Sequence, residues 1–172
     1  MSPLDKNDKN KEKNSMSKTL VAYFSASGVT AGKAKKLADK LGADLCEIRP
    51  VKEYSNADLD WLNKHSRSTV EMNDPESRPE IQALDHDISG YEEIHIGFPI
   101  WWYTAPHIIN TFLESYDLSG KTVIPFATSG GSGMGKTLEG LKGSCNGDLR
   151  PSKMWIGNVP EESIRLWAES KK

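Results

Sequence analysis

The chain has 172 residues, enough for one well-buried domain and too few for two of ordinary size. Its hydrophobic content of 37% excludes a disordered protein, and its formal charge of −2, from 22 basic and 24 acidic residues, excludes a broad basic surface for nucleic acid. No apolar run approaches the roughly 20 residues of a membrane-spanning helix. Cys46 and Cys145 form neither a CxxC pair nor a metal-ligand cluster, which favours a reducing, cytoplasmic compartment.

The first 17 residues differ in composition from the rest of the chain. They are rich in Lys, Asn, Asp, Glu and Ser and lack the apolar core of a signal peptide. We expect a disordered polar leader over residues 1–17, with Met16 as an alternative start, and a single domain over residues 18–172.

Strands and helices begin to alternate at Thr19. The apolar run 19–24 predicts a strand buried on both faces. A helix ending near Gly42 follows, with one apolar face made of Ala34, Leu37, Ala38 and Leu41. A second strand is expected at 44–48. The polar stretch 53–87 predicts one or two helices over 57–72, then an irregular crossover, with these apolar anchors: Leu59, Trp61, Leu62 and Val70.

The same cycle repeats in the second half of the chain. A strand at 93–98 precedes a helix that begins after Pro106, and a strand at 121–128 precedes a helix that buries Leu138 and Leu141. A short strand at 154–156 and a helix within 160–170 close the domain. Five strands alternating with helices predict a doubly wound, five-stranded parallel α/β sheet in a three-layer α/β/α arrangement.

Three loops follow strands and therefore open at the carboxyl edge of the sheet, where ligands of such sheets bind. The first loop has hydroxyls, a glycine and the free amides of a helix start, a combination that suits a phosphate group. The residues of this loop are Ser25, Ala26, Ser27, Gly28, Val29 and Thr30. A plain N-cap turn without a ligand remains the alternative.

The second loop places consecutive aromatic residues directly after a buried strand. It consists of Pro99, Ile100, Trp101, Trp102 and Tyr103. Since only one of the three aromatic rings can easily point into the core, we expect another to stack on a planar ligand. The alternative is an aromatic cap over the end of the sheet.

The third loop has no bulky side chain and can lay its amides along the polar edge of a flat ring. It consists of Ser129, Gly130, Gly131, Ser132 and Gly133. The overlapping segment 130–137 also matches the Walker A pattern of P-loop NTPases, which makes an NTPase the alternative of another class. Against this alternative, no predicted strand ends in the aspartate that would support Mg²⁺.

Taken in order, these three loops resemble the FMN-binding sites of the flavodoxin-like family. The likeness covers nearly the whole chain from Lys18. Three middle segments, 58–61, 66–74 and 78–81, are similar to a bacterial branch known simply as flavodoxin. Compared with electron-carrier flavodoxins, this chain is less acidic, and the glycines of its third loop leave one ring face more open.

The resemblance implies FMN as the cofactor, with its phosphate at 25–30, its ribityl chain and one ring face at 99–103, and its pyrimidine edge at 129–133. It implies an FMN-dependent oxidoreductase in electron transfer, and the open ring face favours an NAD(P)H-dependent flavin or quinone-type reductase with a small electron acceptor. The alternative is a one-electron carrier that meets a redox partner protein. We expect neither a metal site nor a catalytic triad, and only His107 among the histidines lies where it can reach the flavin edge.

Overall fold

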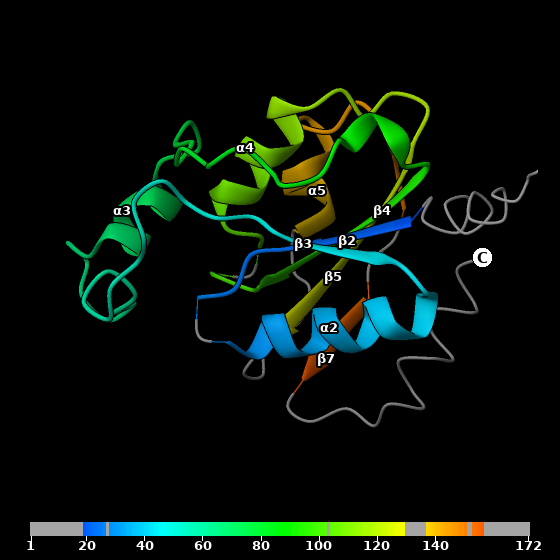
Figure 1. Cartoon of the computed structure of the whole chain (residues 1–172). Helices are drawn as coiled ribbons and strands as arrows, with labels where there is room; N and C mark the ends of the chain where they lie inside the picture. Colours follow the sequence, from blue (N-terminus) through cyan, green and yellow to red (C-terminus); the bar gives the residue numbers. More distant parts are fainter. Residues whose placement is uncertain (1–18, 27, 103, 130–136, 151–152, 157–172) are drawn as a thin grey trace, which may run out of the picture.

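The computed structural model describes residues 19–26, 28–102, 104–129, 137–150 and 153–156. A parallel sheet lies at its centre (Figure 1). The strands are β2 (Thr19–Tyr23), β3 (Asp44–Glu47), β4 (Glu93–Pro99), β5 (Thr122–Ser129), β6 (Asp148–Leu149) and β7 (Lys153–Ile156). They lie in the order β3-β2-β4-β5-β6, and β7 also pairs with β5. The predicted leader at 1–17 and the predicted helix within 160–170 lie outside the described residues.

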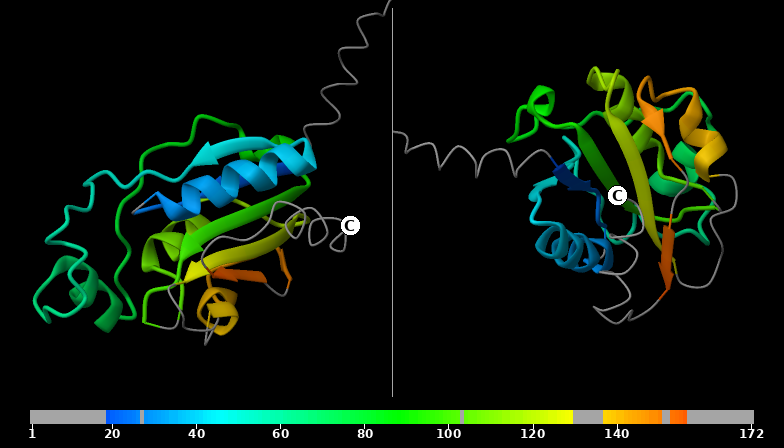
Figure 2. Two further views of the ribbon diagram at one scale, coloured as in Figure 1. Left: turned by 90° about the horizontal axis from the view of Figure 1, so that it is seen from below. Right: turned by 90° about the vertical axis from the view of Figure 1, so that its right-hand side faces the viewer.

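Helices lie on both faces of the sheet, as Figures 1 and 2 show. The helices are α2 (Val29–Leu41), α3 (Arg67–Asn73), the 3₁₀ turn η1 (Ile88–Gly90), α4 (His107–Ser115) and α5 (Thr137–Lys142). On one face α2 buries Ala34, Leu37 and Ala38 against the strands, and it ends at Gly42, whose φ of 66° suits glycine. On the other face α4 and α5 cover the larger core. The predicted doubly wound α/β architecture is confirmed.

The outermost strand is divided into two segments, which the sequence did not reveal. Both β6 and β7 pair with β5, at Thr122–Val123 and at Phe126–Ser129 respectively. Pro125 stands on β5 between these two pairings. Proline has no N–H to donate to a neighbouring strand, so the ladder is interrupted beside it. The predicted fifth strand therefore exists as β7, and the two-residue β6 precedes it.

The segment between β3 and β4 contains less helix than expected. The one α-helix there is α3, with the short 3₁₀ turn η1 after it, and residues 56–59 and 61–62 make turns. The amide of Asp58 donates to Ser55 Oγ and the amide of Ser55 donates to Asp58 Oδ2, bonds that compete with a helix. Trp61, Leu62 and Val70 are exposed, so the prediction that they anchor this segment is wrong. Figure 2 shows α3 beyond the end of the sheet to which the strand arrows point.

Candidate functional site

The three predicted loops start from neighbouring strands. Because β2, β4 and β5 are adjacent and parallel, the segments that follow them lie at the same edge of the sheet. The connection from β2 leads to β3 on one side, and the next strand, β4, lies on the other side of β2. This reversal is the topological switch point, where crevices of doubly wound sheets form. The three predicted loops therefore start at one edge of the sheet, as expected, and residues 130–136 of the third lie outside the described residues.

The first loop is organised around the hydroxyl of Ser25. Ser25 Oγ accepts hydrogen bonds from the amides of Gly28 (3.0 Å) and Ala31 (3.2 Å). Gly28 precedes α2 with a φ of 97°, a conformation that L-residues rarely adopt, and apart from its chain neighbours no described residue has an atom within 4 Å of a Cβ built at this position. Ser25 Oγ therefore caps two of the amides at the start of α2, and the first amides of a helix carry partial positive charge.

Thr30 links the first loop to the strand that leads into the third. Its side chain is only 1% exposed, and its Oγ1 lies 2.8 Å from Thr128 Oγ1. One of these two hydroxyls donates to the other, so Thr30 is committed to the end of β5 rather than pointing into solvent. The first loop is thus held to the end of β5 by a buried hydrogen bond.

The second loop makes a tight turn that separates its two indoles. Trp101 and Thr104 exchange two backbone hydrogen bonds, of 2.9 and 3.1 Å, across the turn. Trp102 lies inside it with a φ of 51°, and it is the one non-glycine with positive φ in the part of the chain that the structure describes. Its side chain is 38% exposed. A left-handed conformation at a large residue stores strain, which is typical of functional sites.

Trp101 instead belongs to a cluster of three rings. Its ring meets those of Phe24 and Tyr54 edge to face, with centroid distances of 5.8 and 5.5 Å. Arg67 of α3 lies 3.8 Å from the centroid of the Tyr54 ring, and the Tyr54 hydroxyl donates to Glu71 (2.5 Å). Burial and the Glu71 carboxylate raise the pKa of Tyr54 far above its ordinary value. The segment that carries α3 is thus packed onto the second loop.

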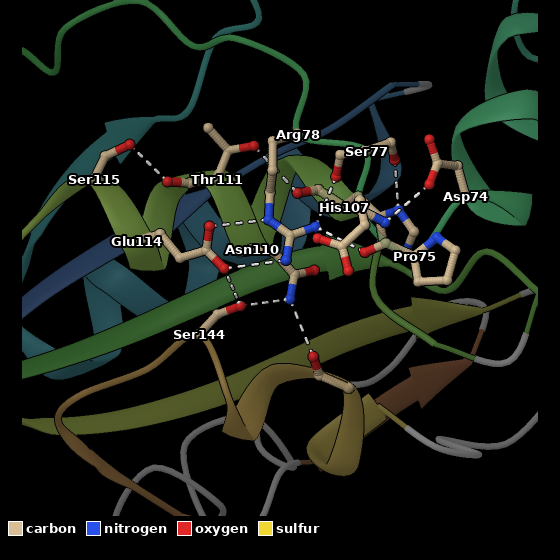
Figure 3. Close-up of polar contacts among 12 residues, drawn as sticks. Asp74, Pro75, Ser77, Arg78, His107, Asn110, Thr111, Glu114, Ser115 and Ser144 are labelled. Carbon is tan, nitrogen blue, oxygen red and sulfur yellow. Dashed lines mark hydrogen bonds and ion pairs between the residues drawn. The ribbon is translucent and has the colours of Figure 1, made fainter.

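Beside Trp102 the surface opens into a cleft of about 970 Å³, which we call the α4–α5 cleft. Its walls are α4, α5 and the segment 75–78, and Trp102 and Thr104 lie at its edge. Figure 3 shows the polar side chains at this cleft. Arg78 donates through Nε and Nη2 to the two carboxylate oxygens of Glu114, at 2.9 and 3.1 Å.

His107 at the start of α4 also lines the cleft. Its Nδ1 lies 2.7 Å from Ser77 Oγ. Burial, with a smaller contribution from the Arg78 guanidinium, lowers the pKa of His107 below 6.5. Burial therefore favours the neutral form of its imidazole.

The structure brings together the predicted site residues that it describes. Ser25, Ala26, Gly28, Val29 and Thr30 lie around the start of α2, and Pro99, Ile100, Trp101 and Trp102 follow β4. Ser129 ends β5. Ser27, Tyr103, Gly130, Gly131, Ser132 and Gly133 lie outside the described residues.

Sequence reasoning missed Tyr54, Arg67 and Arg78 as partners of the site. No local pattern marks them, since their contacts join segments that are distant along the chain. His95 lies buried with its Nε2 2.7 Å from Glu93 Oε2. Within the described ranges, no cluster of His, Cys, Asp and Glu can hold a metal ion. None of the helices described there has the length and apolar character to cross a membrane.

Comparison with known proteins identifies the family. The profile of the flavodoxin family, described as Flavodoxin, matches residues 18–171, and the chain belongs to that family. No curated protein matches the chain. The match includes the segment 130–137, so the Walker A pattern there lies within a flavodoxin sequence and the NTPase alternative loses its support.

Solved structures agree with this assignment. A protein from Bacteroides uniformis assigned as a flavoprotein is 46% identical, with a TM-score of 0.82, over 89% of this chain and 98% of its own. Another from Bacteroides eggerthii is 49% identical, with the same TM-score, over 90% and 97%. A flavoprotein from Lactobacillus acidophilus, solved in complex with FMN, is 24% identical, with a TM-score of 0.66, over 80% and 93%. These findings support FMN as the cofactor.

Proposed function

We propose that this flavodoxin-family protein binds one FMN at the carboxyl edge of its sheet and acts as a reductase with a small-molecule substrate of its own. The observation that carries the proposal is the juxtaposition of three features at one sheet edge. These are the open backbone at the start of α2, the exposed indole of Trp102 and the α4–α5 cleft beside it. FMN would supply the transfer of one or two electrons.

The first loop fits the FMN phosphate. No atom of the described chain beyond the neighbouring residues lies within 4 Å of a Cβ built at Gly28, and the start of α2 has the partial positive charge that favours a phosphate. The oxygen of Ser25 is used to accept from two amides, but its hydrogen is left to donate to a phosphate oxygen. Thr30 holds the loop against β5 through Thr128, which makes it a positioning residue for the same group.

The second loop fits the ring and the ribityl chain. Trp101 is engaged with Phe24 and Tyr54, so Trp102 is the indole left to stack on the ring. The strained turn at Trp102 is fixed from behind by the Trp101 cluster, which limits the freedom lost on binding. The loop at 129–133 would then meet the pyrimidine edge.

The choice of a reductase over a one-electron carrier rests on the cleft and on charge. A carrier needs a shielded ring and an acidic surface for steering, whereas this chain has a formal charge of only −2. A cleft of about 970 Å³ beside Trp102 offers room for a small molecule. Its ligand would lie next to the indole that we place on the flavin.

An anaerobic titration tests the proposal. FMN-loaded protein is mixed with NADH or NADPH, and the visible absorption of oxidised flavin is followed, with free FMN at equal concentration as the control. We expect one of the two dinucleotides to bleach the bound flavin faster than free FMN. If neither does, while a chemical reductant bleaches the same sample, the protein is a carrier that depends on a redox partner protein.

A further inference from the structure

The α4–α5 cleft has polar atoms whose hydrogen-bonding roles can be worked out. The first is the imidazole of His107. Ser77 Oγ lies 2.7 Å from the carbonyl oxygen of Glu71, which can only accept, so the single hydrogen of that hydroxyl is used there. The Ser77 oxygen must then accept from Nδ1–H of His107, 2.7 Å away. The neutral ring is therefore protonated at Nδ1, and its Nε2 is a hydrogen-bond acceptor.

The second is the amide of Asn110 on α4. Its Nδ2 donates to the carbonyl oxygen of Gly140 on α5 (3.0 Å) and to Ser144 Oγ (2.9 Å). Because the Gly140 carbonyl can only accept, the nitrogen of the side-chain amide must be the atom that faces it. Asn110 Oδ1 accordingly faces away from α5, and Asn110 lines the cleft. It is a second acceptor, fixed in orientation by α5.

The single cation among the described lining residues is already used. Arg78 forms a two-point ion pair with Glu114, and its Nη1 donates to the carbonyl oxygens of Pro75 (3.0 Å) and Ser77 (2.7 Å). Ser144 adds a hydrogen bond of 2.6 Å to the same carboxylate, as Figure 3 shows. Glu139 contributes a further negative charge to the lining. A phosphate or carboxylate would find no unpaired positive charge in this part of the cleft.

We infer that the α4–α5 cleft binds a neutral, planar aromatic ligand that donates hydrogen bonds, of the phenol or dihydroxybenzene class. The acceptors His107 Nε2 and Asn110 Oδ1 match its hydroxyl groups, and the cleft of about 970 Å³ beside Trp102 has room for its ring. Among the described lining residues, the carboxylates of Glu114 and Glu139 and the paired Arg78 disfavour the phosphates of a dinucleotide, so such a donor would approach the flavin elsewhere. The inference rests on the proposed function, because it makes this ligand the small-molecule partner of the flavin.

Binding measurements on FMN-loaded protein test the inference. The probes are phenol and 1,3-dihydroxybenzene; anisole, which lacks the donor, and benzoate, which is anionic, serve as controls. Protein labelled with ¹⁵N at histidine reports the tautomer of His107 and its response to each probe. We expect the Nδ1–H tautomer, a shift of Nε2 on addition of phenol, and an affinity for phenol roughly 2- to 10-fold above that for anisole, the range for one hydrogen bond.

The variant His107→Phe keeps a ring and loses the acceptor, and His65→Phe makes the same change at an exposed histidine that does not line the cleft. His107→Phe should reduce the preference for phenol over anisole to about one, and His65→Phe should leave it unchanged. The inference is overturned if phenol and anisole bind alike, if benzoate binds better, or if wild-type His107 has the other tautomer. The tautomer measurement uses wild-type protein, so it does not depend on whether a variant folds. Failure of the proposed function is distinguishable, since it would appear in the anaerobic titration as bound flavin that neither NADH nor NADPH bleaches.

Discussion

The same substitution, glycine to alanine, should have opposite effects at two positions four residues apart. Gly28 precedes α2 with a φ of 97°, while Gly32 lies inside the helix. Beyond the neighbouring backbone, a Cβ at either position meets no atom of the described residues within 4 Å, so neither change causes a clash there. Whether each substitution raises or lowers the free energy of unfolding then depends only on the backbone conformation at that position and on the conformational entropy of the unfolded chain.

The magnitudes follow from those two terms. At Gly28 an alanine must adopt a left-handed conformation, which costs about 1–2 kcal/mol in the free energy of unfolding. At Gly32 an alanine has the better helix propensity and should add about 1 kcal/mol. The two variants should therefore differ by roughly 2–3 kcal/mol, which corresponds to roughly 4–12 °C in unfolding midpoint for a chain of this size.

Urea unfolding of the flavin-free protein measures these differences, and FMN titration then measures binding. The methyl group of Gly28→Ala would stand in the open space where we place the phosphate, so its FMN affinity should fall, by roughly 10- to 100-fold if one charge-assisted hydrogen bond is lost. Gly32→Ala should bind FMN like the wild type. Equal stabilities of the two variants would refute the left-handed conformation at Gly28, and unchanged affinity of Gly28→Ala would refute the phosphate position.

Three further predictions follow from the side chains around the site. Trp101→Ala should lower the unfolding free energy of flavin-free protein by about 1–3 kcal/mol, because it removes two ring contacts. Trp102→Ala should mainly weaken FMN binding, by roughly 2- to 10-fold. A reversed pattern would contradict our assignment of the two indoles. Tyr54→Phe removes the hydrogen bond to Glu71 and should cost about 1–2 kcal/mol in urea unfolding, and no change would show that this bond contributes nothing. The pKa of His107 is lowered in the folded protein, mainly by burial and despite the opposing effects of Glu71 and Asp74. Its contribution to stability is therefore present above the unfolded-state pKa near 6.5 and is lost as the pH falls below that pKa. An NMR titration midpoint at or above 6.5 would contradict this.

Local sequence patterns were sufficient to predict the strands of the sheet and the helices packed on it. The apolar run of β2 and the spacing of Ala34 and Leu37 on α2 depend on burial alone, so their periods are visible in the sequence. The three loops could be placed at one edge because parallel strands share their direction. The reasoning failed where side chains override the pattern, as at residues 56–62. There Asp58 bonds to the backbone of Ser55, and Trp61 remains exposed.

Other features could not be predicted because they join distant segments. Pro125 interrupts the strand pairing on one side of β5 only because β6 and β7 come to lie along it. Nothing in the sequence near position 148 signals that the chain pairs with β5 there. The roles of Trp101 and Trp102 depend on Tyr54, which lies 47 residues before Trp101, and on the turn that gives Trp102 its positive φ. The orientation of His107 likewise depends on Ser77, 30 residues away. In each case the partner is set by the fold and not by the neighbouring sequence.

The central claim is that the start of α2 holds the phosphate of FMN, and parallel titrations of flavin-free protein with FMN and riboflavin test it most directly. Riboflavin has the same ring and ribityl chain without the phosphate, so the ratio of the two dissociation constants isolates the first loop. Two or more charge-assisted hydrogen bonds predict that FMN binds at least about 100-fold more tightly. Equal affinities, or no binding of either flavin, would contradict the account.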